Sequence, residues 1–132
     1  MITIELPMPY YKGKALMSMN VYRNMHHYQL NNFKTEYGAK LEKIMQDYDK
    51  LEAPLALCYE LHFKGSKKRD VMNIASMVDK VFSDVLVQLK LIPDDDYSNV
   101  HKITVKGFGN AEEDRCIVRI SEAVKVEYNY EM

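Results

Sequence analysis

The sequence contains no tryptophan and only two cysteines among its 132 residues. Cys58 and Cys116 stand in segments with strand-like alternation, at a spacing that suits neither a metal site nor a redox pair, so we interpret them as reduced, buried side chains. No apolar run approaches the roughly eighteen residues of a membrane-spanning helix, and the first residues lack the charged start and apolar stretch of a signal peptide. We therefore expect a cytoplasmic protein without a membrane segment.

A basic excess is also missing. Eighteen basic and nineteen acidic residues give a net charge of -1, whereas nucleic-acid-binding domains often carry a clear positive charge. The segment from Lys64 to Arg69, however, holds four basic residues and no acid. Because binding to phosphates depends on local potential, one such basic segment is sufficient; the alternative is a solvated lysine-rich loop. With its single glycine, the segment does not match a P-loop.

Periodicity predicts the fold. Alternating apolar residues predict strands over residues 3–6, 55–63, 103–105 and 116–120, the last two joined as a hairpin through a turn at 107–110. Helical spacing predicts helices from residue 31 or 32 to about 49, and from Asp70 to the Ile92-Pro93 pair. Residues 10–31 are expected as a polar loop, and residues 124–130 as an extra strand or an extended arm. The expected fold is α+β or α/β: a single domain of residues 1–132, with a mixed sheet of four or five strands covered by two helices.

Carboxylates gather at both ends of the second predicted helix. Asp70 follows the basic run Lys67-Lys68-Arg69, and Asp94-Asp95-Asp96 follow the helix. Adjacent carboxylates repel one another, so we expect a fold that brings Asp70 and the triplet to one rim of the sheet in order to bind a divalent cation. Between them, Asn73, Lys80 and Asp84 share one helical face, with Lys80 and Asp84 one turn apart. The plainer interpretation is a surface helix with an ion pair, followed by an acidic turn.

These residues carry a family resemblance. Asp70-Val71-Met72-Asn73, then Lys80, Asp84, Leu86 and the acidic triplet ahead of Val100, resemble the core motif of the RusA-type Holliday-junction resolvases, typically phage or prophage endonucleases. Ser18-Met19-Asn20 and Tyr22-Arg23 resemble the early segment of that family, so that the resemblance covers roughly residues 3–121. It implies a RusA-like fold and a Mg²⁺-dependent endodeoxyribonuclease, with Mn²⁺ as an alternative ion. Such an enzyme resolves four-way DNA by paired symmetric cuts, as a homodimer, in recombination and repair.

The resemblance also implies roles for individual residues. The catalytic residues would be Asp70, Asp95 and Lys80, and the metal ligands Asp70, Asp94, Asp95 and Asp96. The DNA-binding residues would be Lys67, Lys68, Arg69, Asn20 and Arg23, with Asn73 and Asp84 in support.

Two positions depart from the family pattern. Met72 stands where the family has a second aspartate, and a thioether is a poor ligand for Mg²⁺. Lys80 lies one helical turn later than the family lysine, whose place is taken by Ser76; the extra turn keeps the same face. Asp79 is a candidate replacement ligand. The alternatives are therefore a junction-binding module with lost or residual cleavage, or a different metal-dependent phosphoryl chemistry such as nucleotide hydrolysis, for which the sequence has no purine-binding signature.

Overall fold

The computed structural model describes residues 1–12, 15–52 and 54–122. In chain order the elements are β1 (Ile2–Leu6), β2 (Tyr10–Tyr11), β3 (Ala15–Leu16), α1 (Met19–Asn24), α2 (His27–Met45), β4 (Leu55–Lys64), α3 (Val71–Gln88), β5 (Val100–Ala111) and β6 (Arg115–Glu122). Four strands form a mixed sheet in the order β1-β6-β4-β5, and β2 and β3 form a separate two-stranded sheet. Within the main sheet β4 and β5 are parallel, whereas β6 is antiparallel to both β1 and β4. The predicted α+β class is confirmed.

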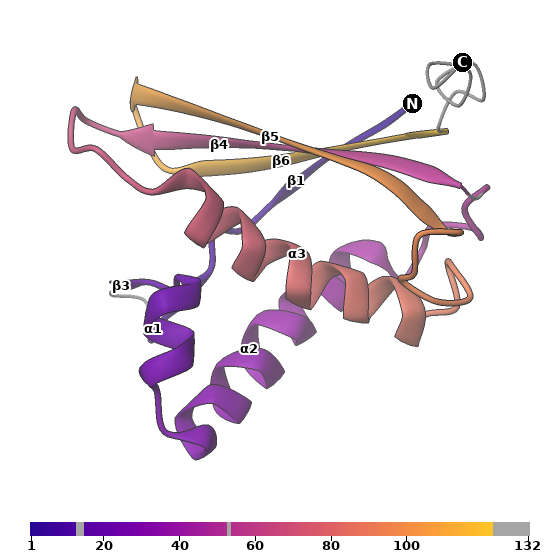
Figure 1. Cartoon of the computed structure of the whole chain (residues 1–132), viewed down its shortest axis with the longest axis horizontal. Helices are drawn as coiled ribbons and strands as arrows, with labels where there is room; N and C mark the ends of the chain where they lie inside the picture. The colour runs from indigo at the N-terminus through magenta and orange to yellow at the C-terminus, as the bar shows by residue number, and fades with distance from the viewer. Residues whose placement is uncertain (13–14, 53, 123–132) are drawn as a thin grey trace, which may run out of the picture.

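Helices α2 and α3 cover one face of the sheet (Figure 1). The predicted apolar stripes explain this packing, because every second residue of β4 from Leu55 to Phe63 is buried and each helix buries one apolar face. At the centre of the core, the hydroxyl of fully buried Tyr59 donates a hydrogen bond of 2.6 Å to Oδ1 of Asp79 on α3. Asp79 is therefore a partner of the core rather than a free metal ligand.

The N-terminal region is more regular than the sequence predicts. Residues 10–31 were expected as a loop, but they include β2, β3, α1 and the beginning of α2, which starts about one turn earlier than expected and ends at Met45. Local capping explains the difference: Oγ of Ser18 accepts a hydrogen bond from N of Val21, and Nδ1 of His26 accepts one from N of Tyr28. Such caps start helices even where the sequence shows no periodic pattern of apolar residues.

The predicted hairpin of residues 103–105 and 116–120 does not form. Residues 107–110 are not a turn but continue β5 to Ala111, and β6 pairs with β1 and β4 rather than with β5. The connection of residues 112–114 passes over the end of β4, where Asp114 accepts a hydrogen bond of 2.8 Å from N of Lys64. The predicted strand or arm at residues 124–130 lies outside the described residues.

Helix α3 ends at Gln88, four residues before the Ile92-Pro93 pair. N of Leu91 bonds to O of Leu86 and N of Lys90 to O of Val87, while Lys90 takes a φ of 60°. This is the Schellman arrangement, in which the residue after the cap turns left-handed and is usually glycine. The proline therefore follows the helix end without causing it.

Candidate functional site

Asp70 and the acidic triplet lie at opposite ends of α3. Because β4 and β5 run parallel, the end of β4, which leads to Asp70, and the beginning of β5, which follows the triplet, lie at opposite ends of the sheet. The eighteen residues of α3 alone span about 27 Å. N of Leu55 bonds to O of Asn99, which fixes the segment after the triplet at the beginning of β4. The expectation that Asp70 and the triplet share a rim is therefore wrong within one chain.

Asp70 caps the start of α3, at the residue where the sequence predicts this helix to begin. Its Oδ1 accepts a hydrogen bond of 3.3 Å from N of Asn73, and its Oδ2 accepts one of 2.7 Å from Nδ2 of the same residue. Both carboxylate oxygens are thereby oriented by Asn73. Met72, in the first turn of α3, has 55% of its surface exposed.

A cleft of about 400 Å³ separates the basic loop (Lys67, Lys68 and Arg69) from the end of β5. The other residues that line it are Phe63, Ser66, Val71, Gly107, Phe108, Gly109 and Asn110. Phe108 is 45% exposed and stacks on His62, with ring centres 4.8 Å apart. Cations beside an exposed ring are the features that hold a phosphate backbone and stack on a base. The sequence did not indicate Phe108, because its two flanking glycines pointed to a turn.

A polar contact holds β2 near this cleft. The hydroxyl of Tyr10 donates to Oδ2 of Asp114, the carboxylate that also accepts from N of Lys64. Burial raises the pKa of Tyr10 to about 12, helped by the hydrogen bond and charge of Asp114, whereas the nearby charge of Arg69 acts to lower it. Tyr10, Asp114 and Arg69 therefore lie close together, although they come from three separate segments, and no sequence pattern indicates this grouping.

Lys80 does not pair with Asp84. Its Nζ lies 5.4 Å from the centre of the Tyr22 ring on α1, and Lys80–Asp84 is not an ion pair in the described part of the chain. A basic residue placed N-terminal to an acid at this spacing is the weaker orientation of such a pair, so the aromatic ring competes well. Asn20 and Arg23 are exposed on α1, which Figure 1 places below the first half of α3. Lys80 therefore belongs with α1, about 15 Å along the helix from Asp70.

The acidic turn (Asp94, Asp95 and Asp96) is stabilised from within. Oδ1 of Asp96 accepts hydrogen bonds from N and Oγ of Ser98 and from Nδ2 of Asn99, and these bonds lower the pKa of Asp96. The pKa of Asp95 is raised, first by partial burial, then by the carboxyl group of Asp94 and by the charge of Asp84. Asp96 thus shapes the turn, while Asp94 and Asp95 form an acidic pair with Asp84 nearby.

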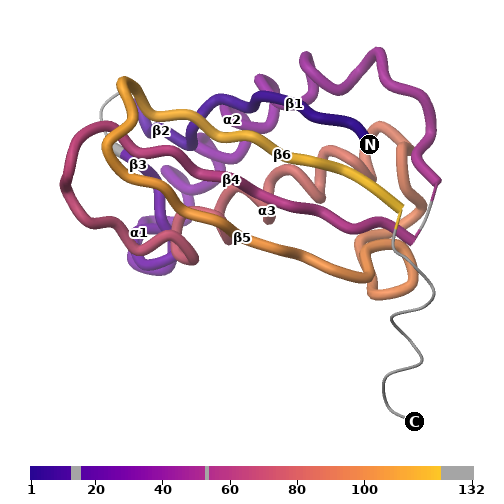
Figure 2. The backbone as a smooth tube through the Cα atoms, turned by 90° about the horizontal axis from the view of Figure 1, so that it is seen from above, coloured from indigo at the N-terminus to yellow at the C-terminus, as the bar shows by residue number. Residues whose placement is uncertain are grey.

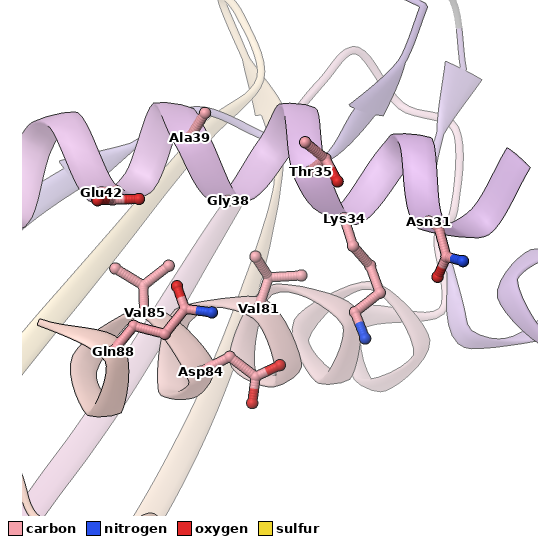
Figure 3. A pocket seen from close by; sticks show the side chains of 10 residues that line it. All are labelled: Asn31, Lys34, Thr35, Gly38, Ala39, Glu42, Val81, Asp84, Val85 and Gln88. Atoms are coloured by element: carbon pink, nitrogen blue, oxygen red, sulfur yellow. The ribbon is translucent and has the colours of Figure 1, made fainter. Parts of the chain in front are cut away.

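A hollow of about 490 Å³ lies between α2 and α3 (Figure 3). Lys34 and Asn31 reach into it from α2, and Asp84 and Gln88 from α3. Asp84 is the only predicted site residue that lines it. Across residues 1–12, 15–52 and 54–122, no group of three His, Cys, Asp or Glu side chains could hold a metal ion. Within one chain, Asp70 therefore lies apart from the other three predicted metal ligands.

Comparison of the sequence with protein-family models gave no match, and neither did comparison with curated proteins. None of the described helices is long and apolar enough to cross a membrane.

Proposed function

We propose that this protein is a cytoplasmic, metal-dependent endodeoxyribonuclease that resolves four-way DNA junctions as a homodimer in recombination and repair. The observation that carries the proposal is the arrangement of side chains where the basic loop leads into α3. There, a carboxylate oriented by Asn73 lies beside three cations and a cleft with an exposed aromatic ring. A phosphodiester held by the loop would lie next to Asp70.

The basic loop and the cleft supply the DNA contacts in this proposal. Lys67, Lys68 and Arg69 are exposed and follow one another, so their charges add locally even though the whole chain has a net charge of -1. Contacts to phosphates position a strand without reading bases, so recognition would depend on the shape of the DNA. Phe108 would stack on a base left unpaired at the branch point.

The metal requires a second copy of the chain. Asp70 alone offers one carboxylate, and the acidic turn lies at the far end of α3. In a twofold dimer with antiparallel α3 helices, Asp70 of one copy would lie near Asp94 and Asp95 of the other, a set of hard oxygen ligands that suits Mg²⁺. When bound, such an ion lowers the pKa of a coordinated water and offsets charge on the phosphate. Two symmetric sites match the two symmetric cuts that resolution needs.

Lys80 takes a positioning role in this proposal. Because it lies about 15 Å from Asp70 along α3 and above the Tyr22 ring, it is placed to contact a neighbouring phosphate together with Asn20 and Arg23 of α1. These three side chains would extend the basic surface beyond the loop.

A junction-binding module without cleavage is the second candidate. Met72 favours it, because it stands in the sequence where the family pattern has a second aspartate and its thioether offers no hard oxygen to Mg²⁺. Magnesium affinity separates the two candidates: a nuclease binds the ion in the presence of the junction, and a pure binding module does not.

The direct test is incubation with a labelled four-way junction and a matched linear duplex, each with and without millimolar Mg²⁺. We expect paired nicks in the junction only, and only with Mg²⁺. Asp49→Asn is a suitable control variant, because Asp49 is exposed beyond the end of α2 and has no part in the proposed site. Binding of the junction without nicking would favour the second candidate, and equal affinity for junction and duplex would refute both.

A further inference from the structure

Three connections of the chain meet at one end of the main sheet, where the basic loop lies. Figure 2 shows the β2–β3 pair, the loop from β4 to α3 and the connection from β5 to β6 gathered at this end. Asp114, in the last of these, links all three. Its Oδ1 accepts a hydrogen bond of 2.8 Å from N of Lys64, where β4 ends, and its Oδ2 accepts one from the hydroxyl of Tyr10 on β2. Both oxygens of this carboxylate are therefore occupied by uncharged donors.

The position of Tyr10 is fixed by the core. N of Tyr10 bonds to O of Met8 at 2.8 Å and N of Met17 to O of Pro9 at 2.7 Å, and the side chains of both methionines are buried. Burial, and then the hydrogen bond and charge of Asp114, raise the pKa of Tyr10 to about 12, so its hydroxyl keeps the proton at neutral pH. The hydroxyl therefore remains a donor to Asp114 under these conditions.

Arg69 is the cation that this carboxylate would otherwise attract. The charge of Arg69 acts on the hydroxyl of Tyr10, so it lies near Oδ2 of Asp114, yet Arg69 forms no ion pair within the described part of the chain. Arg115 and Arg119 behave differently, because each donates to both oxygens of a glutamate through two nitrogens, the shorter bond being 2.7 Å in each pair. Such bidentate pairing needs both carboxylate oxygens. At Asp114 both are already occupied.

We infer that Tyr10 is a positioning residue of the DNA-binding surface: its hydroxyl occupies Asp114, and Arg69 thereby stays available to a phosphate of the DNA backbone. This inference rests on the proposed function, because it assigns a DNA phosphate to Arg69. Without the hydroxyl, Oδ2 of Asp114 has lost its donor and pairs with Arg69 instead. Tyr10 acts through Arg69 and has no need to touch the DNA itself.

One lost phosphate contact has a measurable effect on binding. Each contact contributes about 0.9 to the slope of log K against log salt, which corresponds to about fivefold in affinity at about 0.15 M salt. Tyr10→Phe keeps the ring and removes one oxygen. It should bind a four-way junction about fivefold more weakly than wild type, with a slope reduced by about one, in fluorescence anisotropy without Mg²⁺.

Tyr11→Phe is the matched control on the same strand. The ring of Tyr11 lies against Phe33, with ring centres 6.4 Å apart, while its hydroxyl has no hydrogen-bond partner among the described residues. The substitution therefore removes an oxygen without releasing a carboxylate, and both affinity and salt slope should equal those of wild type.

A second substitution separates positioning from a merely structural role. In the double variant Tyr10→Phe/Asp114→Asn the charge that would capture Arg69 is gone, while the amide oxygen still accepts from N of Lys64. Affinity and salt slope should therefore return close to wild type, whereas two independent structural losses would add. In an Arg69→Ala background, Tyr10→Phe should weaken binding no further.

Chemical modification of Arg69 tests the inference without DNA. Phenylglyoxal modifies accessible arginine side chains, and peptide mass spectrometry reports the rate at Arg69 alone. The rate should fall in Tyr10→Phe, where a carboxylate pairs with the guanidinium group, and recover in the double variant Tyr10→Phe/Asp114→Asn.

Three outcomes would overturn the inference: an unchanged salt slope in Tyr10→Phe, a double variant that binds more weakly than Tyr10→Phe, or an unchanged modification rate at Arg69. The proposed function fails separately. A wild-type protein that binds no junction would refute it, together with the DNA phosphate as the ligand of Arg69, and the modification rates would still decide whether Tyr10 keeps Arg69 unpaired. Junction cleavage by wild type, with an unchanged slope in Tyr10→Phe, would keep the nuclease and refute the positioning role.

Discussion

Gly107→Ala should destabilise the protein because it forces β5 away from α3. A Cβ at this position would lie 2.7 Å from Cγ2 and 3.2 Å from Cβ of Val71. Both contacts are too short, and the second involves an atom that no rotamer change can move. Carbon atoms in good contact are at least about 3.5 Å apart, so the strand and the helix must separate by about 0.8 Å. Such overpacking costs about 1–3 kcal/mol.

The loss is partly offset, because alanine restricts the unfolded chain more than glycine and so contributes about 0.5–1 kcal/mol to stability. We therefore expect a net loss of about 1–2 kcal/mol in the free energy of unfolding, measured by urea denaturation. Gly109→Ala is the matched control, because its Cβ would meet only O of Gly65, at 3.8 Å, and its stability should stay within about 0.5 kcal/mol of wild type. In a Val71→Ala background the penalty at residue 107 should largely disappear. Equal effects at the two glycines, or additive effects of Val71→Ala and Gly107→Ala, would refute this close contact.

Three further predictions concern charge and ligands. Replacement of Lys67, Lys68 and Arg69 by alanine should weaken junction binding and reduce the slope of log K against log salt by up to about three, as fluorescence anisotropy would show; an unchanged slope would mean that the loop is merely solvated. Met72→Asp should change the cleavage rate only modestly if the wild-type carboxylates suffice for the metal, whereas a switch from no cleavage to cleavage would show that Met72 marks a lost ligand. A hydrogen bond from Arg119 is the main cause that lowers the pKa of Glu60 from its usual 4.5, with a smaller effect from His62, so this contact stabilises the fold above that pH and is lost as acid protonates the carboxylate. Glu60→Gln should therefore flatten the fall in stability below pH 4.5 in acid titrations, and a curve parallel to wild type would contradict the assignment.

Periodicity identified the elements that bury one face. Helix α3 was predictable because Asp70 caps it and its apolar residues recur every three or four positions, and β4 because every second residue is apolar. Short elements such as β2, β3 and α1 were not predicted, since they depend on single caps and on contacts with distant segments. The glycines of β5 were misinterpreted for a related reason: Gly107 is required by Val71, a contact across 36 positions that no local pattern reveals.

The candidate site was predictable only in parts. The start of α3 at Asp70 and the basic loop before it were predictable from residue types and spacing, but the hydrogen bond from Nδ2 of Asn73 to Asp70 was not predicted. The position of the acidic turn could not be predicted, because it depends on β5 being parallel to β4. The alternation of apolar and polar residues along a strand is the same whether the strand pairs parallel or antiparallel. Lys80 pairs with Tyr22 rather than Asp84 because α1, which the sequence did not reveal, packs against α3.

Mixing two inactive variants tests most directly whether this is a junction nuclease with a site shared between two copies. Asp70→Asn keeps a good cap for α3, and Asp95→Asn alters the opposite end, so both variants should fold and bind junctions but neither should cleave. After subunit exchange, about half of the dimers are mixed, and each of these has one intact site, so nicking should return to about a quarter of the wild-type level. If exchange is verified and the mixture still does not nick junctions that wild type cleaves, the two carboxylates act within one chain and the account is wrong.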